Sequence, residues 1–244
     1  MADSQIEWTD STWNPVAGCS LASAGCTNCY AMKMARRLEA MGIEKYAGLT
    51  QKSGRHVTWN GVVREDTSAL EVPLRWRKPR KIFVNSMSDL FHPAVSDSFI
   101  WQVWKVMETT PRHAYQILTK RPDRMRDILT SRELPVLSNV WLGTSVENSD
   151  AVPRIEDLRK TPATIRFISF EPLIGSVGQV NLDGIHWAII GGESGVNARP
   201  IRERWIDEIH DQCISYETAF FFKQWGAWGK DNQRRSKKAN GREY

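Results

Sequence analysis

The stretch HAYQILTKRPDRMRDILTSRELPVLSNVWLGTSVEN, residues 113–148, decides the fold of this chain. It begins with an apolar run at His113–Thr119, continues at helical spacing over Asp123–Thr130, and ends with a second apolar run at Asn139–Thr144. Runs that are apolar at nearly every position are typical of strands covered on both faces. Two such strands joined by a helix pair in parallel, because a parallel connection needs a long crossover.

The same alternation continues on both sides of this stretch. Further strands are predicted at Lys81–Asn85, Ile165–Phe170, His186–Ile190 and Ala219–Lys223, with a short first strand at Thr12–Ala17. Further helices are predicted at Ala31–Met41, Ser98–Met107, Asp150–Lys160 and Glu203–Tyr216. Seven strands favour a complete or partial TIM-like β/α barrel over a doubly wound sheet, although strand counting alone does not separate the two.

Length and composition fit one large α/β domain, since the chain has 244 residues, of which 41% are hydrophobic. We expect the barrel domain to span residues 1–228, with residues 43–67 as an insertion or lid and residues 229–244 as a basic tail. The net charge of +5 and the pI near 9.1 indicate an anionic partner, although much of the excess lies in that tail.

The chain is expected to be soluble and cytoplasmic, with no membrane partner. No apolar run approaches the roughly 20 residues that cross a bilayer, and MADSQIEWTDS lacks the features of a secretory signal. Three of the four cysteines lie within eleven consecutive residues. This spacing favours a thiolate site in a reducing compartment over disulfides.

The strongest local signal is the spacing of Cys19, Cys26 and Cys29, which are separated by six and then two residues. Three thiolates on one loop can hold three irons of a cubane cluster and leave the fourth iron open, whereas an electron-transfer cluster normally has four cysteines. A structural zinc site needs a fourth ligand, such as His56 or His92. Free packing thiols are the third alternative, and Cys213 is interpreted as helix packing.

Polar side chains follow nearly every predicted strand, and in parallel α/β folds these positions share one edge with the ligand site. Glu171, Glu193, Lys120 and Lys223 are candidate catalytic residues, because carboxylates and amines at a half-buried edge can move protons or bind charged groups. A structural network of ion pairs is the alternative. Candidate hydrogen-bond partners for a cofactor or substrate are Thr119, Ser145 and Gln224.

Several longer motifs carry a resemblance to a known family. They are TWNPVAGC, CTNCYA, PLRWRKPRKIFVNSMSDLFH, LTKRP, WLGTSVEN, FISFEPL, IIGGESG and FFKQWG. Together they are similar to the bacteriophage and prophage three-Cys-motif proteins, distant relatives of radical S-adenosylmethionine (SAM) enzymes. The resemblance covers Trp8 to Trp225 and implies a β/α barrel of the radical SAM type, in the host cytoplasm if a phage encodes the chain.

The resemblance also implies a 4Fe-4S cluster on Cys19, Cys26 and Cys29, with SAM bound at the open iron and a reductant such as flavodoxin or ferredoxin. The spacing of six and two differs from the usual three and two. In radical SAM enzymes a Gly-Gly-Glu segment that meets SAM follows the second strand, whereas here that segment, Gly191 to Glu193, follows the sixth. We therefore assign SAM binding to Ser86, Ser88 and Asp89, for which a helix cap is the alternative role of Asp89.

Two function classes follow from the sequence. The first is a radical SAM enzyme that cleaves SAM and abstracts hydrogen from a substrate, in the family's context a modified nucleobase or nucleotide of phage DNA. The second is a zinc-stabilised nucleic-acid-binding protein without redox chemistry. Either would use RWRKPRK, residues 75–81, and the basic tail, while tryptophans beside these cations stack on bases or pack in the protein. Trp101 and Trp104 are expected to pack.

Overall fold

Seven parallel strands form the main sheet of the computed structural model, in which residues 7–54, 56–132 and 134–244 are described. The start of the predicted domain, residues 1–6, lies outside the described residues. The strands lie side by side in chain order: β1 (Ser11–Trp13), β6 (Lys81–Val84), β7 (Ala114–Thr119), β8 (Val140–Ser145), β9 (Ile165–Phe170), β10 (Trp187–Gly191) and β11 (Ala219–Gln224).

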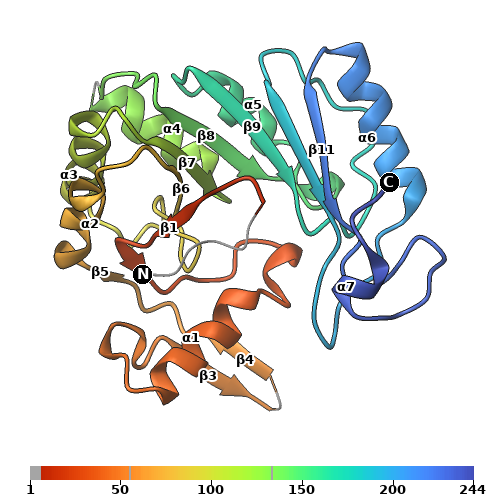
Figure 1. Cartoon of the computed structure of the whole chain (residues 1–244), viewed down its shortest axis with the longest axis horizontal. Helices are drawn as coiled ribbons and strands as arrows, with labels where there is room; N and C mark the ends of the chain where they lie inside the picture. Colours follow the sequence, from red (N-terminus) through yellow and green to blue (C-terminus); the bar gives the residue numbers. More distant parts are fainter. Residues whose placement is uncertain (1–6, 55, 133) are drawn as a thin grey trace.

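Sequential order distinguishes this sheet from a doubly wound one, in which the strand order reverses. The sheet curls in one direction, and β1 and β11 remain its two edges, so that it forms a half-barrel (Figure 1). The predicted partial barrel is therefore confirmed, and a closed barrel is not formed. The carboxyl ends of all seven strands share one edge, where a parallel fold places its ligand site.

Four helices cover the outside of the half-barrel (Figure 1). They are α3 (Asp97–Thr109), α4 (Pro122–Ser131), α5 (Arg154–Lys160) and α6 (Glu203–Ser215). Each turns an apolar face toward the sheet, and the core between the layers includes Val84, Ile117, Leu142, Ile168 and Ile190. The predicted helices are confirmed, except that α5 begins later because Ser149–Ala151 forms a separate 3-10 turn. The other 3-10 turns are Ala24–Cys26, Glu44–Tyr46 and Thr67–Glu71.

The predicted first strand, Thr12–Ala17, is wrong in extent. The chain breaks it at Asn14 and Pro15, and only β1 joins the main sheet. Proline has no N–H to donate to a ladder, so a central strand does not continue through it. After the break, β2 (Val16–Ala17) pairs antiparallel with β5 (Arg64–Glu65) in a small second sheet.

The segment between the cysteines and β6 adds a separate small layer. It contains α1 (Tyr30–Ala40), an antiparallel hairpin of β3 (Thr50–Ser53) and β4 (His56–Trp59), and the short helix α2 (Val72–Arg75). Met32, Ala35, Leu49 and Trp59 form a buried cluster that joins α1 to the hairpin. In Figure 1 this layer lies below the half-barrel, apart from helices α3 to α6.

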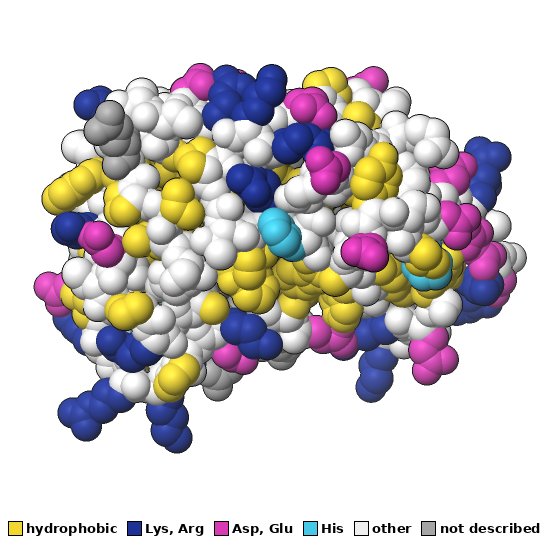
Figure 2. Space-filling view, turned by 90° about the horizontal axis from the view of Figure 1, so that it is seen from above, with side chains coloured by type: hydrophobic (Ala, Val, Ile, Leu, Met, Phe, Trp, Pro, Cys, Tyr) yellow, Lys and Arg dark blue, Asp and Glu magenta, His cyan; other side chains and the backbone are white. Residues whose placement is uncertain are grey.

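Aromatic side chains fill the concave side of the sheet. Trp8, Phe83, Phe167 and Ile189 form a buried cluster there, and Trp8 lies edge-on to Phe83 at 5.0 Å between ring centroids. Gly143 leaves the space that this packing needs, because a Cβ at that position would lie 2.6 Å from the ring of Phe167. Hydrophobic side chains also form a band across the upper face of the molecule (Figure 2).

The last residues of the chain fold back onto the half-barrel. Tyr244 packs against Phe220 and Phe222 of β11, and the indole N–H of Trp225 donates to the carbonyl oxygen of Glu243 at 2.8 Å. The short helix α7 (Lys237–Asn240) lies close to the end of β11 (Figure 1). Among the described residues, no helix has the length and apolar character needed to span a bilayer.

Candidate active site

The three-cysteine loop lies at the carboxyl edge of the half-barrel. It follows β2, and Gly18 at its start forms a bridge with Ser88 in the loop after β6. Gly18 has a φ of +90°, and a Cβ there would lie 2.2 Å from the carbonyl oxygen of Val62. Only glycine fits this position, because other residues are strained at such a φ and would also collide with the backbone. The loop therefore starts from a fixed point beside β6.

The three thiols of this loop are close enough to affect one another. Cys26 is buried, and Cys19 and Cys29 are half-buried. Burial raises the pKa of Cys19 to about 12 and also raises the pKa of Cys29, and a negative charge on Cys26 raises both further. Backbone N–H groups of Ala31 and Met32 in the first turn of α1 act in the opposite direction on Cys29. A helix start favours a thiolate there.

Three basic side chains lie around the thiols. The Arg121 guanidinium Nη1 is 4.0 Å from the Sγ of Cys19. Burial lowers the pKa of Lys120 and of Arg154, and the negative charge of Cys26 raises both. These cations come from the ends of β7 and from α5, so two crossovers of the half-barrel bring positive charge to the loop.

This donor set fits a cluster held by three thiolates. Thiolates and cluster sulfides bring negative charge, and the three cations offset it in a partly buried site. Cys213 is only 1% exposed in the helical layer on α6, as predicted for a packing residue. Within the described ranges, no three His, Cys, Asp or Glu side chains are grouped so that they could hold a single metal ion.

The two histidines considered as zinc ligands have different surroundings. The His92 ring nitrogen Nε2 lies 2.8 Å from the Ser20 hydroxyl, next to Cys19, and its Nδ1 accepts from the N–H of Ala94 at 3.1 Å. His56 is exposed at the start of β4. His92 thus orients the cysteine loop through Ser20.

Asp89, which we assigned to SAM, is a buried junction between three strand ends. Its carboxylate accepts from the Thr119 hydroxyl at 2.7 Å, from the Lys120 N–H at 3.1 Å and from the Arg121 guanidinium at 2.8 Å. It also accepts from the N–H of Phe91 at 3.0 Å, the turn role considered as its alternative. With these four donors, Asp89 holds Arg121 beside Cys19.

Ser86 and Ser88 flank the point where the chain leaves β6. The Ser86 hydroxyl donates to Asn14 Oδ1 at 3.1 Å, and the Ser88 hydroxyl donates to the carbonyl oxygen of Val16 at 2.8 Å. Asn85 precedes them with a φ of +59°, and its buried Nδ2 has no hydrogen-bond partner among the described residues. A buried amide N–H without a partner is a group that a bound ligand can satisfy.

Glu147, which the sequence analysis did not select, holds the cysteine loop from the end of β8. Its side chain has no exposed surface and pairs with Lys120 and, at 3.0 Å, with Arg154. The Ser23 hydroxyl donates to it at 2.9 Å, and a Cβ at Gly25 would lie 2.5 Å from it. The only signal for this role in the sequence was the position of Glu147 directly after an apolar strand.

Glu193 holds the same loop from the end of β10. Its carboxylate accepts from Asn28 Nδ2 at 3.0 Å and from the N–H and guanidinium of Arg199, with the shortest contact at 2.6 Å. Burial favours the neutral acid, but these hydrogen bonds outweigh it and keep the pKa of Glu193 below its ordinary value. Glu147 and Glu193 therefore fix the loop on both sides of Cys26.

Glu171 and Lys223 form a pair at the ends of β9 and β11. The Lys223 ammonium lies 3.0 Å from Glu171 Oε1 and 6.0 Å from the centre of the Trp8 ring. Both side chains keep partial exposure, 15% for Glu171 and 21% for Lys223. Of the four predicted catalytic residues, these two form a pair with each other that keeps access to solvent, while Lys120 and Glu193 are bound to the loop.

The remaining predicted contact residues are buried near this edge. The carbonyl oxygen of Ser145 accepts from Arg154 at 2.8 Å, and Thr119 is bonded to Asp89. Gln224 donates to the carbonyl oxygen of Gly192 at 3.3 Å, and its buried Oε1 has no partner within the described residues. Gln224 thus has an acceptor available at the edge.

The comparisons with known proteins begin with a family match over almost the whole chain. A family model described as protein of unknown function (DUF5131) matches residues 3–244. The chain belongs to the DUF5131 family. No curated protein matches the sequence of this DUF5131 chain.

Two solved structures resemble the DUF5131 chain at low similarity. Both are of spore photoproduct lyase with dinucleoside spore photoproduct bound, and one of them is a cysteine-to-alanine mutant. The sequence identities are 12% and 10%, and the TM-score is 0.42 for each. The matches cover 82% of the DUF5131 chain, which spans 60% of the length of those neighbours.

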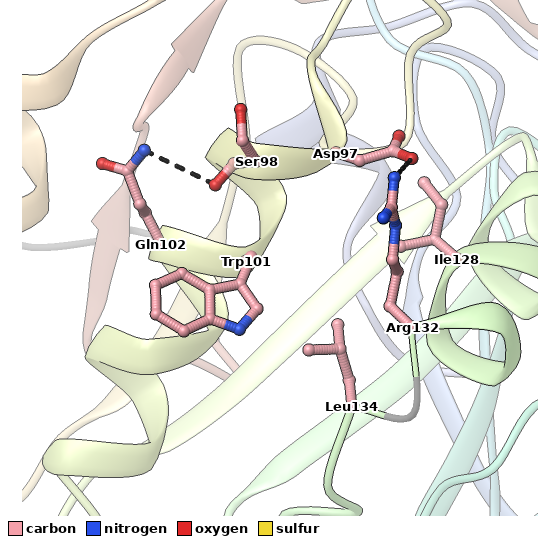
Figure 3. Close-up of a pocket in the computed structure, with 7 residues that line it drawn as sticks. All are labelled: Asp97, Ser98, Trp101, Gln102, Ile128, Arg132 and Leu134. Carbon is pink, nitrogen blue, oxygen red and sulfur yellow. Dashed lines mark hydrogen bonds and ion pairs between the residues drawn. The ribbon is translucent and has the colours of Figure 1, made fainter.

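A groove of about 500 Å³ lies away from this edge, on the outer helical layer of the DUF5131 chain. Trp101 and Leu134 line it between α3 and α4, beside the ion pair of Asp97 and Arg132 (Figure 3). Trp101 is 51% exposed, so the prediction that it packs is wrong, whereas Trp104 is buried as predicted.

Most tryptophans considered for base stacking in the DUF5131 chain are packed inside it. Trp8, Trp13, Trp76 and Trp225 are each less than a tenth exposed, and the half-buried indole of Trp228 donates to the carbonyl oxygen of Ala198 at 2.7 Å. The packing alternative therefore applies to these residues. RWRKPRK directly precedes β6 and so lies at the amino edge, opposite the cysteine loop.

Proposed function

We propose that this chain is a radical SAM enzyme whose 4Fe-4S cluster is held by Cys19, Cys26 and Cys29. The observation that carries the proposal is the group of three interacting thiols, surrounded by cations, at the carboxyl edge of a parallel half-barrel. When bound, such a cluster supplies the electron that cleaves the sulfonium of SAM and starts radical chemistry. A reductant such as flavodoxin or ferredoxin would provide that electron.

The chain's own residues would position the cofactor and the substrate. Arg121, fixed by Asp89, keeps a positive charge beside Cys19, and Lys120 and Arg154 do the same near Cys26. Glu147 and Glu193 hold the loop. We infer that they are positioning residues, because all of their carboxylate contacts are to neighbouring side chains and backbone.

Binding of SAM is proposed for the polar groups between β6 and β11. Ser86, Ser88 and Asp89 line the end of β6, and Thr119, Ser145 and Gln224 come from the ends of β7, β8 and β11. The unpartnered amide atoms of Asn85 and Gln224 support this choice, since a polar ligand at this edge would satisfy both.

Glu171 and Lys223 are the residues that we propose for contact with the substrate. Their pair is partly exposed, so a substrate can reach the carboxylate and the ammonium, to exchange a proton or to bind a charged group. The proposed substrate is a nucleobase or nucleotide, of phage DNA as the family resemblance implies. Hydrogen abstraction would begin its rearrangement or other modification.

The metal content of anaerobically purified protein tests this function. We expect brown protein with about four irons and four sulfides per chain, and a change in the electron paramagnetic resonance spectrum of the reduced protein when SAM is added. Colourless protein with one zinc per chain would instead favour a zinc-stabilised nucleic-acid-binding protein. A cluster whose spectrum ignores SAM would also contradict the proposal.

A further inference from the structure

Three basic side chains from distant parts of the sequence gather at the entrance of the candidate site. The Lys33 ammonium on α1 lies 3.6 Å from where a Cβ of Gly195 would be, and the Arg234 guanidinium lies 3.5 Å from the carbonyl oxygen of Gly195. Gly195 belongs to the loop after β10 that also contains Glu193. Lys33 and Arg234 therefore flank the loop that holds the cysteine segment.

Lys237 brings a third positive charge to the same entrance. It is the first residue of α7, and the charges of Lys223 and Glu171 both affect its pKa, which burial lowers. It therefore lies near the pair proposed for substrate contact. In Figure 1, α1 and α7 both lie on the lower side of the molecule, toward which β11 points.

These three cations differ from their basic neighbours in having no acidic partner. Lys230 pairs with Glu203, Arg235 with Asp231, and Arg242 with Glu7. Neither Lys33, Arg234 nor Lys237 forms an ion pair with any residue in the described part of the chain, and all three are exposed. Uncompensated cations at the entrance of a site attract anionic ligands and raise their local concentration.

We propose that Lys33, Arg234 and Lys237 form a cationic entrance that binds the phosphate groups of a nucleotide or nucleic acid and so presents its base to the candidate site. This inference rests on the proposed function and adds where the substrate is held. Phosphate contacts of this kind fix the register of a nucleic acid without reading its sequence. The base would then lie toward Glu171 and Lys223.

The other basic segment provides a matched control. Arg77 and Lys78 are exposed within RWRKPRK and also form no ion pair with the described residues, but they precede β6 at the opposite edge of the sheet. A double substitution to glutamate changes the net charge by the same amount at either place. Only location distinguishes the two variants.

Fluorescence anisotropy with a labelled single-stranded oligonucleotide tests the cationic entrance, using iron-free protein so that binding does not depend on SAM cleavage. We expect the double variant Arg234→Glu and Lys237→Glu to bind about tenfold more weakly or worse, with a salt slope reduced by about 2, about one for each lost phosphate contact. The double variant Arg77→Glu and Lys78→Glu should bind within about twofold of the unaltered protein.

Two further arms complete the test. Lys33→Glu, on a different element, should weaken binding in the same direction, which guards against a folding defect in the C-terminal segment. Competition with a mononucleotide shows whether the phosphate belongs to a free nucleotide or to a polymer. Equal loss in both double variants, or no binding of oligonucleotide and mononucleotide by the unaltered protein, would overturn the cationic entrance, whereas loss of SAM cleavage alone would overturn only the proposed function.

Discussion

Cys26 interacts with both other thiols of the loop, whereas Cys213 is isolated in the helical layer. Substituting Cys26 by serine removes one of three proposed iron ligands without changing the size of the side chain. We expect Cys26→Ser to lose nearly all of its iron after anaerobic reconstitution, and Cys213→Ser to keep about four irons per chain. Measuring iron and sulfide in both variants checks this. Equal iron in the two would show that the thiols are wrongly grouped.

Glu147 is the fully buried carboxylate that compensates Lys120 and Arg154. Glu147→Gln would leave two partly buried cations without their counter-charge, and we expect the free energy of unfolding to fall by about 3 kcal/mol. The control is Glu156→Gln on α5, whose ion pair with Arg159 at 3.2 Å is 56% exposed on the glutamate side and contributes less than about 1 kcal/mol.

Urea unfolding of the iron-free protein measures both variants. If Glu147→Gln is no less stable than Glu156→Gln, then the network at the end of β8 does not hold the cysteine loop. Neither Glu147 nor its contacts could be recognised from the sequence as an anchor for this loop. The cysteine spacing is a local pattern, but the contacts of Glu147 and Glu193 join residues more than a hundred positions apart.

At the level of elements, the apolar runs predicted six of the seven strands of the main sheet well, because strands covered by helices outside and aromatic residues inside are apolar at most positions. The first strand was wrong after Trp13, since the break at Pro15 moves Val16 and Ala17 into another sheet. Curvature was also beyond the sequence: counting strands did not separate an open half-barrel from a closed one.

The strand pair of β8 and β9 depends on Gly143, which lies opposite Phe167. In Gly143→Ala the new methyl group would lie 2.6 Å from the Phe167 ring, and such overpacking of a buried site costs about 1–3 kcal/mol of unfolding free energy. In the control, Gly229→Ala, the nearest atoms are the far ends of the Asn240, Asp231 and Arg235 side chains, which can move. Thermal unfolding of both variants checks the difference, and equal melting temperatures would contradict this packing.

At the scale of the whole molecule, winding in one direction explains why the site lies where it does. All helices cover the outer face, and every strand ends at the same edge. The loops after β2, β6, β7, β8 and β10 therefore meet, and residues from four strand ends surround the three thiols. The groove beside Trp101 lies outside this arrangement, on the helical layer.

The central claim is that the three thiols hold a cluster that reduces SAM. The most direct measurement is the formation of 5'-deoxyadenosine by anaerobically reconstituted protein with SAM and dithionite, with Cys26→Ser as the matched control. We expect 5'-deoxyadenosine to accumulate with the unaltered protein and to stay at background with Cys26→Ser. Background levels from unaltered protein that contains a full complement of iron and sulfide would contradict the claim.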